Sequence, residues 1–186
     1  KAYRKEVCGL IKAGARYIQF DDVTLPFLCD GDYAPFFHSW GSTPGEILDT
    51  YAKCINKVIA GVPDDVVFTM HTCRGNREGL WAAEGGYDFI SDVLFNQINV
   101  SGYFMEYDTP RAGTFEPLRL LPAGKIVALG IVSSKVPELE GTDLLKRRID
   151  EAAKFTPLEQ LSIAPQCGFA SSIKGNPLNE VEQKAK

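Results

Sequence analysis

The sequence has 186 residues, enough for one domain with a hydrophobic core, and we expect no second domain within residues 1–186. Hydrophobic residues make up 45% and charged residues 24% of the chain, as in an ordinary globular protein. The net charge of −4 argues against a nucleic-acid partner, which usually requires a basic surface. No apolar run approaches the roughly 20 residues of a membrane-spanning helix, so no membrane partner is expected.

The five cysteines are an odd number and lie far apart, unlike the cysteines of a disulfide scaffold. They include no Cys-x-x-Cys pair, which argues against thioredoxin-like redox chemistry and against zinc-finger spacing. We therefore expect free thiols in a reducing cytoplasm. The first residue is Lys1 rather than Met, so we also expect the chain to begin inside a longer protein.

The N-terminal part predicts a helix, a strand, a loop and a second helix. Residues 3–14 have the apolar spacing of an amphipathic helix, and residues 16–20 have the composition of a buried strand. Residues 25–41 are rich in proline, glycine and aromatic residues, which predicts a loop. A capping-box sequence that begins at Thr43 predicts a second helix over residues 44–60.

The rest of the chain continues this alternation, which predicts parallel β-α units. Polar and thiol residues follow the strands, as they do at the active-site face of a β/α barrel. A complete (βα)8 barrel has eight strands and typically ~250 residues. Five units therefore predict either an open α/β sheet or the C-terminal part of a TIM-type barrel. The further strands are expected at 66–70, 103–105, 125–132 and 161–164, and the further helices at 87–95, 142–155 and 181–186.

One set of side chains at the predicted strand ends has the composition of a metal site. His71 and Cys73 are two residues apart and would point to the same face of an extended chain. Glu106 and Cys167 each follow another predicted strand. Together the four residues offer one nitrogen, two sulfurs and one oxygen, a tetrahedral set that suits zinc. The same pattern also fits a packed histidine and two cysteines that act as small buried apolar residues.

Several segments, in order along the whole chain, resemble the cobalamin-independent methionine synthase family and in particular its shorter, single-domain branch. These segments are Tyr-Ile-Gln-Phe-Asp (17–21), His-Thr-Cys-Arg-Gly-Asn (71–76), Glu-Gly-Gly-Tyr (84–87), Phe-Met-Glu-Tyr-Asp (104–108), Arg-Ala-Gly-Thr-Phe-Glu-Pro-Leu-Arg (111–119), Leu-Gly-Ile-Val-Ser-Ser-Lys (129–135) and Pro-Gln-Cys-Gly-Phe-Ala (165–170).

The resemblance implies a (βα)8 barrel whose last five β-α units are supplied by residues 1–186. It implies a zinc ion held by His71, Cys73, Glu106 and Cys167, and methyl transfer from a donor to homocysteine to give methionine. Zinc bound to a thiol favours its ionised, nucleophilic form at neutral pH. The resemblance also assigns Asp21 to the amino-acid part of homocysteine. Alternatively, the acidic pair at 21–22 caps the following loop.

The sequence departs from the family pattern in two places. Val132 occupies the position of a family histidine that serves as a general acid toward the folate, which leaves open a folate, corrinoid or other donor. The following residues 133–135 either contact donor or substrate or form a solvated loop. The strands that precede residue 16 in the family barrel are absent from residues 1–186. Because unpaired strand edges need cover, we expect a homodimer or a missing N-terminal segment.

Other residues have two interpretations each. Arg74 and Asn76 either bind a carboxylate or donor, or only shape a loop. Arg111 and Arg119 either recognise an anion or carry surface charge. The aromatic residues at 36, 37 and 40 either stack on a flat ring or anchor a loop.

Three functions compete. The first is zinc-dependent methylation of homocysteine in the cytoplasm, and the second is methyl or alkyl transfer to another thiol or from a non-folate donor. The third is a non-catalytic module in which zinc is structural. A structural zinc site is closed, whereas a catalytic site keeps an exchangeable position.

Overall fold

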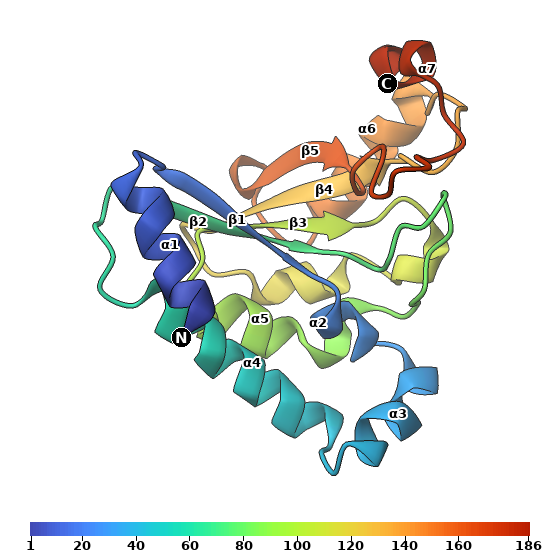
Figure 1. Ribbon diagram of the computed structural model, residues 1–186. Coiled ribbons are helices and arrows are strands. Elements are labelled where there is room, and N and C mark those ends of the chain that lie inside the picture. Colours follow the sequence, from blue (N-terminus) through green and yellow to red (C-terminus); the bar gives the residue numbers. More distant parts are fainter.

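Five parallel strands form one sheet, in the order of the chain, in the computed structural model of residues 1–186 (Figure 1). Every predicted strand is present, with ends that differ by at most two residues from the prediction. Each connection advances the sheet by one strand in the same direction, as in a β/α barrel and unlike a doubly wound sheet. The strands are β1 (Tyr17–Asp22), β2 (Val67–Thr72), β3 (Gly102–Glu106), β4 (Ile126–Val132) and β5 (Leu161–Pro165).

The predicted long helices are also present, with two corrections. The segment predicted as a loop over residues 25–41 contains two short helices. The aromatic side chains of residues 36, 37 and 40 pack on one another and stabilise the second of them. The helix predicted over residues 87–95 begins with a 3-10 turn and becomes an α-helix only from Ser91. The helices are α1 (Ala2–Lys12), α2 (Thr24–Phe27), α3 (Ala34–Ser39), α4 (Pro44–Ile59), α5 (Ser91–Gln97), α6 (Thr142–Ala152) and α7 (Glu180–Ala185).

The two faces of the sheet differ in composition. Phe68, Met70 and Tyr103 belong to the hydrophobic core, which also contains buried residues of α4 and α5. Figure 1 shows these two helices along one side of the sheet. On the opposite face, β2 carries His71 and β4 carries Gly130, as the alternation of side chains along a strand requires. The hydrophobic face therefore fixes the register, and the register places the polar side chains together on the other face.

The sheet has two free edges. β1 pairs only with β2, and β5 pairs only with β4. Tyr17 on β1 and Ile163 on β5 are both exposed. The expected homodimer or preceding segment remains a prediction. No helix of the structure is both long enough and apolar enough to span a membrane.

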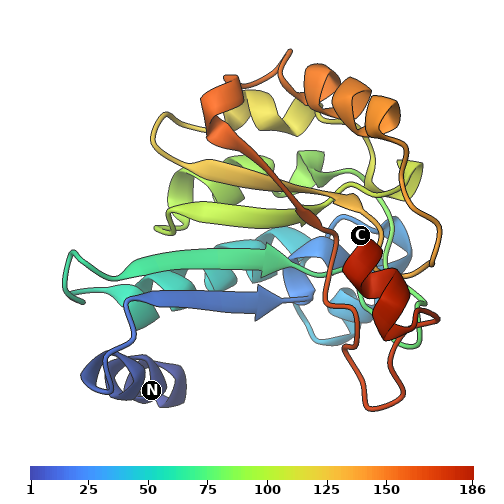
Figure 2. The same ribbon diagram turned by 90° about the horizontal axis from the view of Figure 1, so that it is seen from above.

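The segment that follows β5 lies across the carboxyl ends of the strands. Figure 1 shows this segment and α7 above the sheet on the side of β4 and α6, and Lys186 at the end of α7 donates to the Glu140 carboxylate at 3.0 Å. Figure 2 shows the same segment from above, where it overlies the carboxyl ends of the strands. Asn76 donates from its side chain to the carbonyl oxygen of Gly168 at 2.8 Å, and Asn176 donates to the carbonyl oxygen of Ser134 at 2.6 Å. These bonds fix the segment over the face on which His71 lies.

The capping box at the start of α4 offers a first test of the fold. The Thr43 hydroxyl accepts from the Glu46 backbone N–H at 3.3 Å, and the Glu46 carboxylate accepts from the Thr43 backbone N–H at 2.8 Å. We expect Thr43→Ala to lower the free energy of unfolding by about 1 kcal/mol, measured by urea denaturation. Thr50→Ala in the same helix is the control. It should not destabilise, because alanine is the better helix former at this exposed position.

Candidate metal centre

Four side chains from the ends of three strands meet at the carboxyl edge of the sheet. His71 lies in β2, Cys73 directly follows that strand, Glu106 ends β3, and Cys167 lies two residues after β5. One potential ligand atom from each lies within 4.8 Å of every other. Three of the four residues are buried, and Cys167 is partly buried. This distance is short enough for a single ion to contact all four.

The imidazole of His71 is oriented as a metal ligand would be. Its Nδ1 lies 3.0 Å from the carbonyl oxygen of Phe104, so the ring proton of the neutral form sits on Nδ1. Its Nε2 is buried and has no hydrogen-bond partner. Metal-binding histidines characteristically donate their other ring N–H to a carbonyl or carboxylate. The buried, unpartnered Nε2 therefore fits a metal ion.

The side chains of Cys73 and Cys167 form a hydrogen-bonded pair. Their sulfur atoms lie 3.7 Å apart, too far for a disulfide bond of about 2.05 Å. The hydrogen bond from Cys73 holds the pKa of Cys167 well below its usual value, and the same bond raises the pKa of Cys73. Burial lowers the pKa of His71, but the nearby Cys167 thiolate outweighs this effect and raises it. Thiolate and imidazole are ligands that suit zinc.

The lowered pKa of Cys167 predicts a selective reaction of the metal-free protein. After chelation at pH 6, iodoacetamide should alkylate Cys167 first, because its thiolate persists at a pH where an unperturbed thiol, with a pKa of about 8.5, is protonated. Peptide mass spectrometry measures the modified site, with the exposed Cys8 as internal reference. Added zinc should protect Cys167. Equal labelling of Cys8 and Cys167 would contradict the thiolate assignment.

The carboxylate of Glu106 is completely buried and accepts three hydrogen bonds. Its Oε1 accepts from the backbone N–H of Arg74 at 2.7 Å. Its Oε2 accepts from Arg111 Nη2 at 2.8 Å and from Gln166 Nε2 at 3.1 Å. The carboxylate of Glu106 is therefore held by residues from three segments, which follow β2, β3 and β5.

The two arginines of the 111–119 segment have different environments. Arg119 is exposed and pairs with Glu116, which agrees with the surface-charge interpretation. Arg111 is buried and pairs with Glu106 and Asp108, so it is not a surface charge. Arg111 and Gln166 are the two site residues whose roles were missed in the sequence, since their contacts depend on how two separate loops fold back.

Asn76 and Arg74, which follow the His71 and Cys73 pair, both contact other parts of the chain. Asn76 donates to Gly168 and also to the Ser171 hydroxyl at 2.9 Å, and that hydroxyl lies 3.8 Å from the sulfur of Cys167. Arg74 is fully buried, with its guanidinium 4.4 Å from the centre of the Tyr87 ring. Both residues thus have contacts within the chain, and their binding of a carboxylate or donor remains a prediction.

The acidic pair at the end of β1 divides between two roles. Asp22 accepts from the backbone N–H of Leu25 at 2.7 Å and caps the following loop. Asp21 is exposed, its carboxylate makes no hydrogen bond within the chain, and it pairs in register with His71. Burial raises the pKa of Asp21, although the nearby His71 lowers it. The Asp21 carboxylate is therefore beside the metal-ligand set and free to bind a ligand.

Neither Val132 nor His38 adds an imidazole to the candidate metal centre. Val132 ends β4 and follows Gly130 on the face that carries Glu106. His38, the other histidine of the chain, is exposed on α3. No imidazole other than that of His71 lies in the candidate ligand set.

Comparison with known proteins agrees with this architecture. A family model described as the catalytic domain of cobalamin-independent synthase matches residues 1–183. The protein YxjG of Bacillus subtilis (strain 168), described as uncharacterized, is 44% identical over 187 residues, which cover 100% of this chain and 50% of that protein. A methionine synthase of Pyrococcus abyssi is 26% identical over 169 residues, covering 91% of this chain and 41% of that protein.

A solved structure of a protein from Listeria monocytogenes, described as a vitamin-B12-independent methionine synthase, has the same arrangement. It is 34% identical with a TM-score of 0.73, and the match covers 91% of this chain and 47% of that one. The chain belongs to the cobalamin-independent synthase catalytic-domain family, and its five β-α units are part of a (βα)8-type fold. The chain spans about half the length of the curated relatives YxjG and YxjH, which it matches over its entire length.

Proposed function

We propose that the chain carries the zinc-binding part of an enzyme that methylates the thiol of homocysteine to give methionine. The observation that carries this proposal is the convergence of His71, Cys73, Glu106 and Cys167, whose donor atoms lie within 4.8 Å of one another. One nitrogen, two sulfurs and one oxygen suit a tetrahedral zinc site. Membership of the cobalamin-independent synthase family supports the same activity.

The residues of the chain have separate roles in this proposal. His71, Cys73, Glu106 and Cys167 hold the ion, which when bound supplies stabilisation of a substrate thiolate at neutral pH. Asp21 binds the ammonium group of the amino-acid substrate, because its carboxylate lies beside the site without a partner in the chain. In the overall reaction the substrate sulfur loses a proton and bonds to the methyl carbon. The bond between methyl and donor breaks, and the donor leaves with the electron pair and takes up a proton.

A second candidate keeps the same site and changes the donor. Val132 is apolar and cannot transfer a proton to a leaving folate, and the only other histidine of the chain is on α3. We therefore retain methyl or alkyl transfer from a donor other than methylfolate as the alternative. Both candidates treat residues 1–186 as one domain, the C-terminal part of a barrel.

The test uses the intact protein in which this chain occurs, loaded with zinc and supplied with homocysteine. Methyltetrahydrofolate, a methylated corrinoid and a sulfonium compound are offered separately, and methionine is measured by mass spectrometry. Product only with methyltetrahydrofolate supports the first candidate, and product only with another donor supports the second. A zinc-loaded protein that produces no methylated thiol with any of the three donors, and shows no change at the zinc site when thiol is added, would fit a structural metal and overturn both candidates.

A further inference from the structure

The hydrogen bonds of Glu106 leave little of its carboxylate free. A carboxylate has about four acceptor positions, two on each oxygen. Arg111 and Gln166 both donate to Oε2, at 2.8 and 3.1 Å, so that oxygen is satisfied by the protein. The backbone N–H of Arg74 takes one position on Oε1 at 2.7 Å. One position on Oε1 therefore remains for a metal ion.

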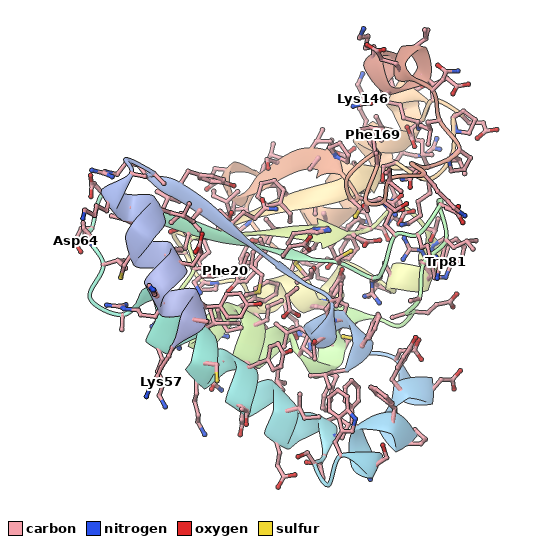
Figure 3. All side chains as sticks on the ribbon, viewed as in Figure 1. Phe20, Lys57, Asp64, Trp81, Lys146 and Phe169 are labelled. Carbon is pink, nitrogen blue, oxygen red and sulfur yellow. The ribbon has the colours of Figure 1, made fainter.

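Arg111 is shared between two carboxylates. The same Nη2 that donates to Glu106 also lies 2.7 Å from Asp108 Oδ1. The side chains of Arg111 and Asp108 are only 4% and 3% exposed, so water does not screen the pairs. The guanidinium is 4.8 Å from the centre of the Trp81 ring, which lies in the loop after β2 at the carboxyl side of the sheet (Figure 3). The strength of the bond to Glu106 thus depends on Asp108.

We propose that Arg111 is a positioning residue for Glu106: by holding Oε2, it would make Glu106 a weak ligand for a metal ion at this site, one that a substrate thiol would readily displace. This inference rests on the proposed function, because a displaceable ligand matters only if a thiol comes to the metal. A carboxylate engaged with a guanidinium has less charge to donate to an ion. Asp108 limits this effect, since it draws part of the Arg111 charge away from Glu106.

The proposal predicts opposite effects for two neighbouring substitutions. In Arg111→Met, Oε2 of Glu106 loses a charged partner and, being buried, turns to the metal as the nearest cation. Glu106 then binds more tightly and resists displacement. In Asp108→Asn, Arg111 loses its competing carboxylate and bonds more strongly to Glu106, which then leaves more easily. A residue that only held Glu106 in place would not give effects of opposite sign.

Cobalt(II) in place of zinc makes the ligand exchange visible. The intact protein is loaded with cobalt, homocysteine is added in steps without methyl donor, and the thiolate-to-cobalt charge-transfer absorption is recorded. We expect Arg111→Met to raise, by about 10-fold or more, the homocysteine concentration at which half of the absorption change has occurred. We expect Asp108→Asn to lower it. The control Arg119→Met, which removes an exposed arginine from the same segment, should leave it unchanged.

Each other outcome decides against the proposal. If Arg111→Met is folded but binds no cobalt, Arg111 only holds the ligand in place. If both variants shift the half-change concentration in the same direction, or neither shifts it, the sharing of Arg111 does not control displacement. If Arg111→Met does not fold, Asp108→Asn alone is the test: a lower homocysteine concentration for half of the absorption change supports the proposal, and an equal or higher one contradicts it. A wild-type protein whose spectrum is unchanged by thiol contradicts the proposed function itself, a result distinct from any difference between variants.

Discussion

Replacing Cys167 by serine is expected to weaken zinc binding by more than about 100-fold, because loss of an outer-shell partner alone typically costs 10–100-fold. The substitution removes one of two thiolates and leaves Cys73, His71 and Glu106 around a hydroxyl, which is a poor zinc ligand. Zinc affinity is measured by competition with a chromophoric chelator at pH 7. The circular dichroism spectrum should stay the same, since Cys167 lies after β5 and is not part of the core.

The matched control for this substitution is Cys8→Ser. Cys8 is an exposed free thiol on α1 and lies outside the four-residue set. The Cys8→Ser substitution should therefore leave zinc affinity unchanged. If Cys167→Ser binds zinc as tightly as Cys8→Ser does, the four-residue set does not hold the ion.

Replacing Gly130 by alanine is expected to have the largest effect on stability. An added methyl carbon would lie 2.7 Å from Cα of Gln166 and 2.7 Å from the carbonyl oxygen of Met105. Both contacts are with backbone, so β3 and the segment after β5 would have to move apart. We expect a loss of about 3 kcal/mol in the free energy of unfolding, measured by urea denaturation. Zinc affinity should fall as well, because Glu106 and Cys167 are adjacent to the displaced atoms.

Gly9→Ala provides the opposite result for the same chemical change. Gly9 is exposed within α1, and an added methyl carbon would meet no atom within 4 Å. Alanine is favoured over glycine in a helix interior by about 0.5–1 kcal/mol, so this variant should be slightly more stable. If Gly130→Ala is as stable as the wild type, β3 and the segment after β5 do not pack as closely against Gly130 as the structure shows.

Local sequence patterns predicted the strands because each is a short apolar run followed by polar residues. The ligand set could be proposed for the same reason: parallel strands end at one edge, so His71, Glu106 and Cys167 were expected to lie close together. The structure brings them within reach of one ion. Their role as ligands remains a proposal, as does the role of Asp21.

The surroundings of the site could not be predicted from spacing. Arg111 and Gln166 reach Glu106 from positions five and 60 residues away, and nothing in their local sequence indicates that contact. Both contacts depend on the path that the loops take after the strands, and the periodicity of a sequence does not describe that path. The short helices between residues 24 and 39 were missed because helices of four and six residues are too short to show a period.

Zinc X-ray absorption spectroscopy of the intact protein, before and after addition of homocysteine without a methyl donor, would show whether a substrate thiol binds the metal. We expect two sulfur and two nitrogen or oxygen neighbours in the resting protein, from Cys73, Cys167, His71 and Glu106. We expect a third sulfur, and one fewer oxygen, after homocysteine binds. A zinc ion whose neighbours are the same with and without homocysteine would contradict thiol activation at this centre.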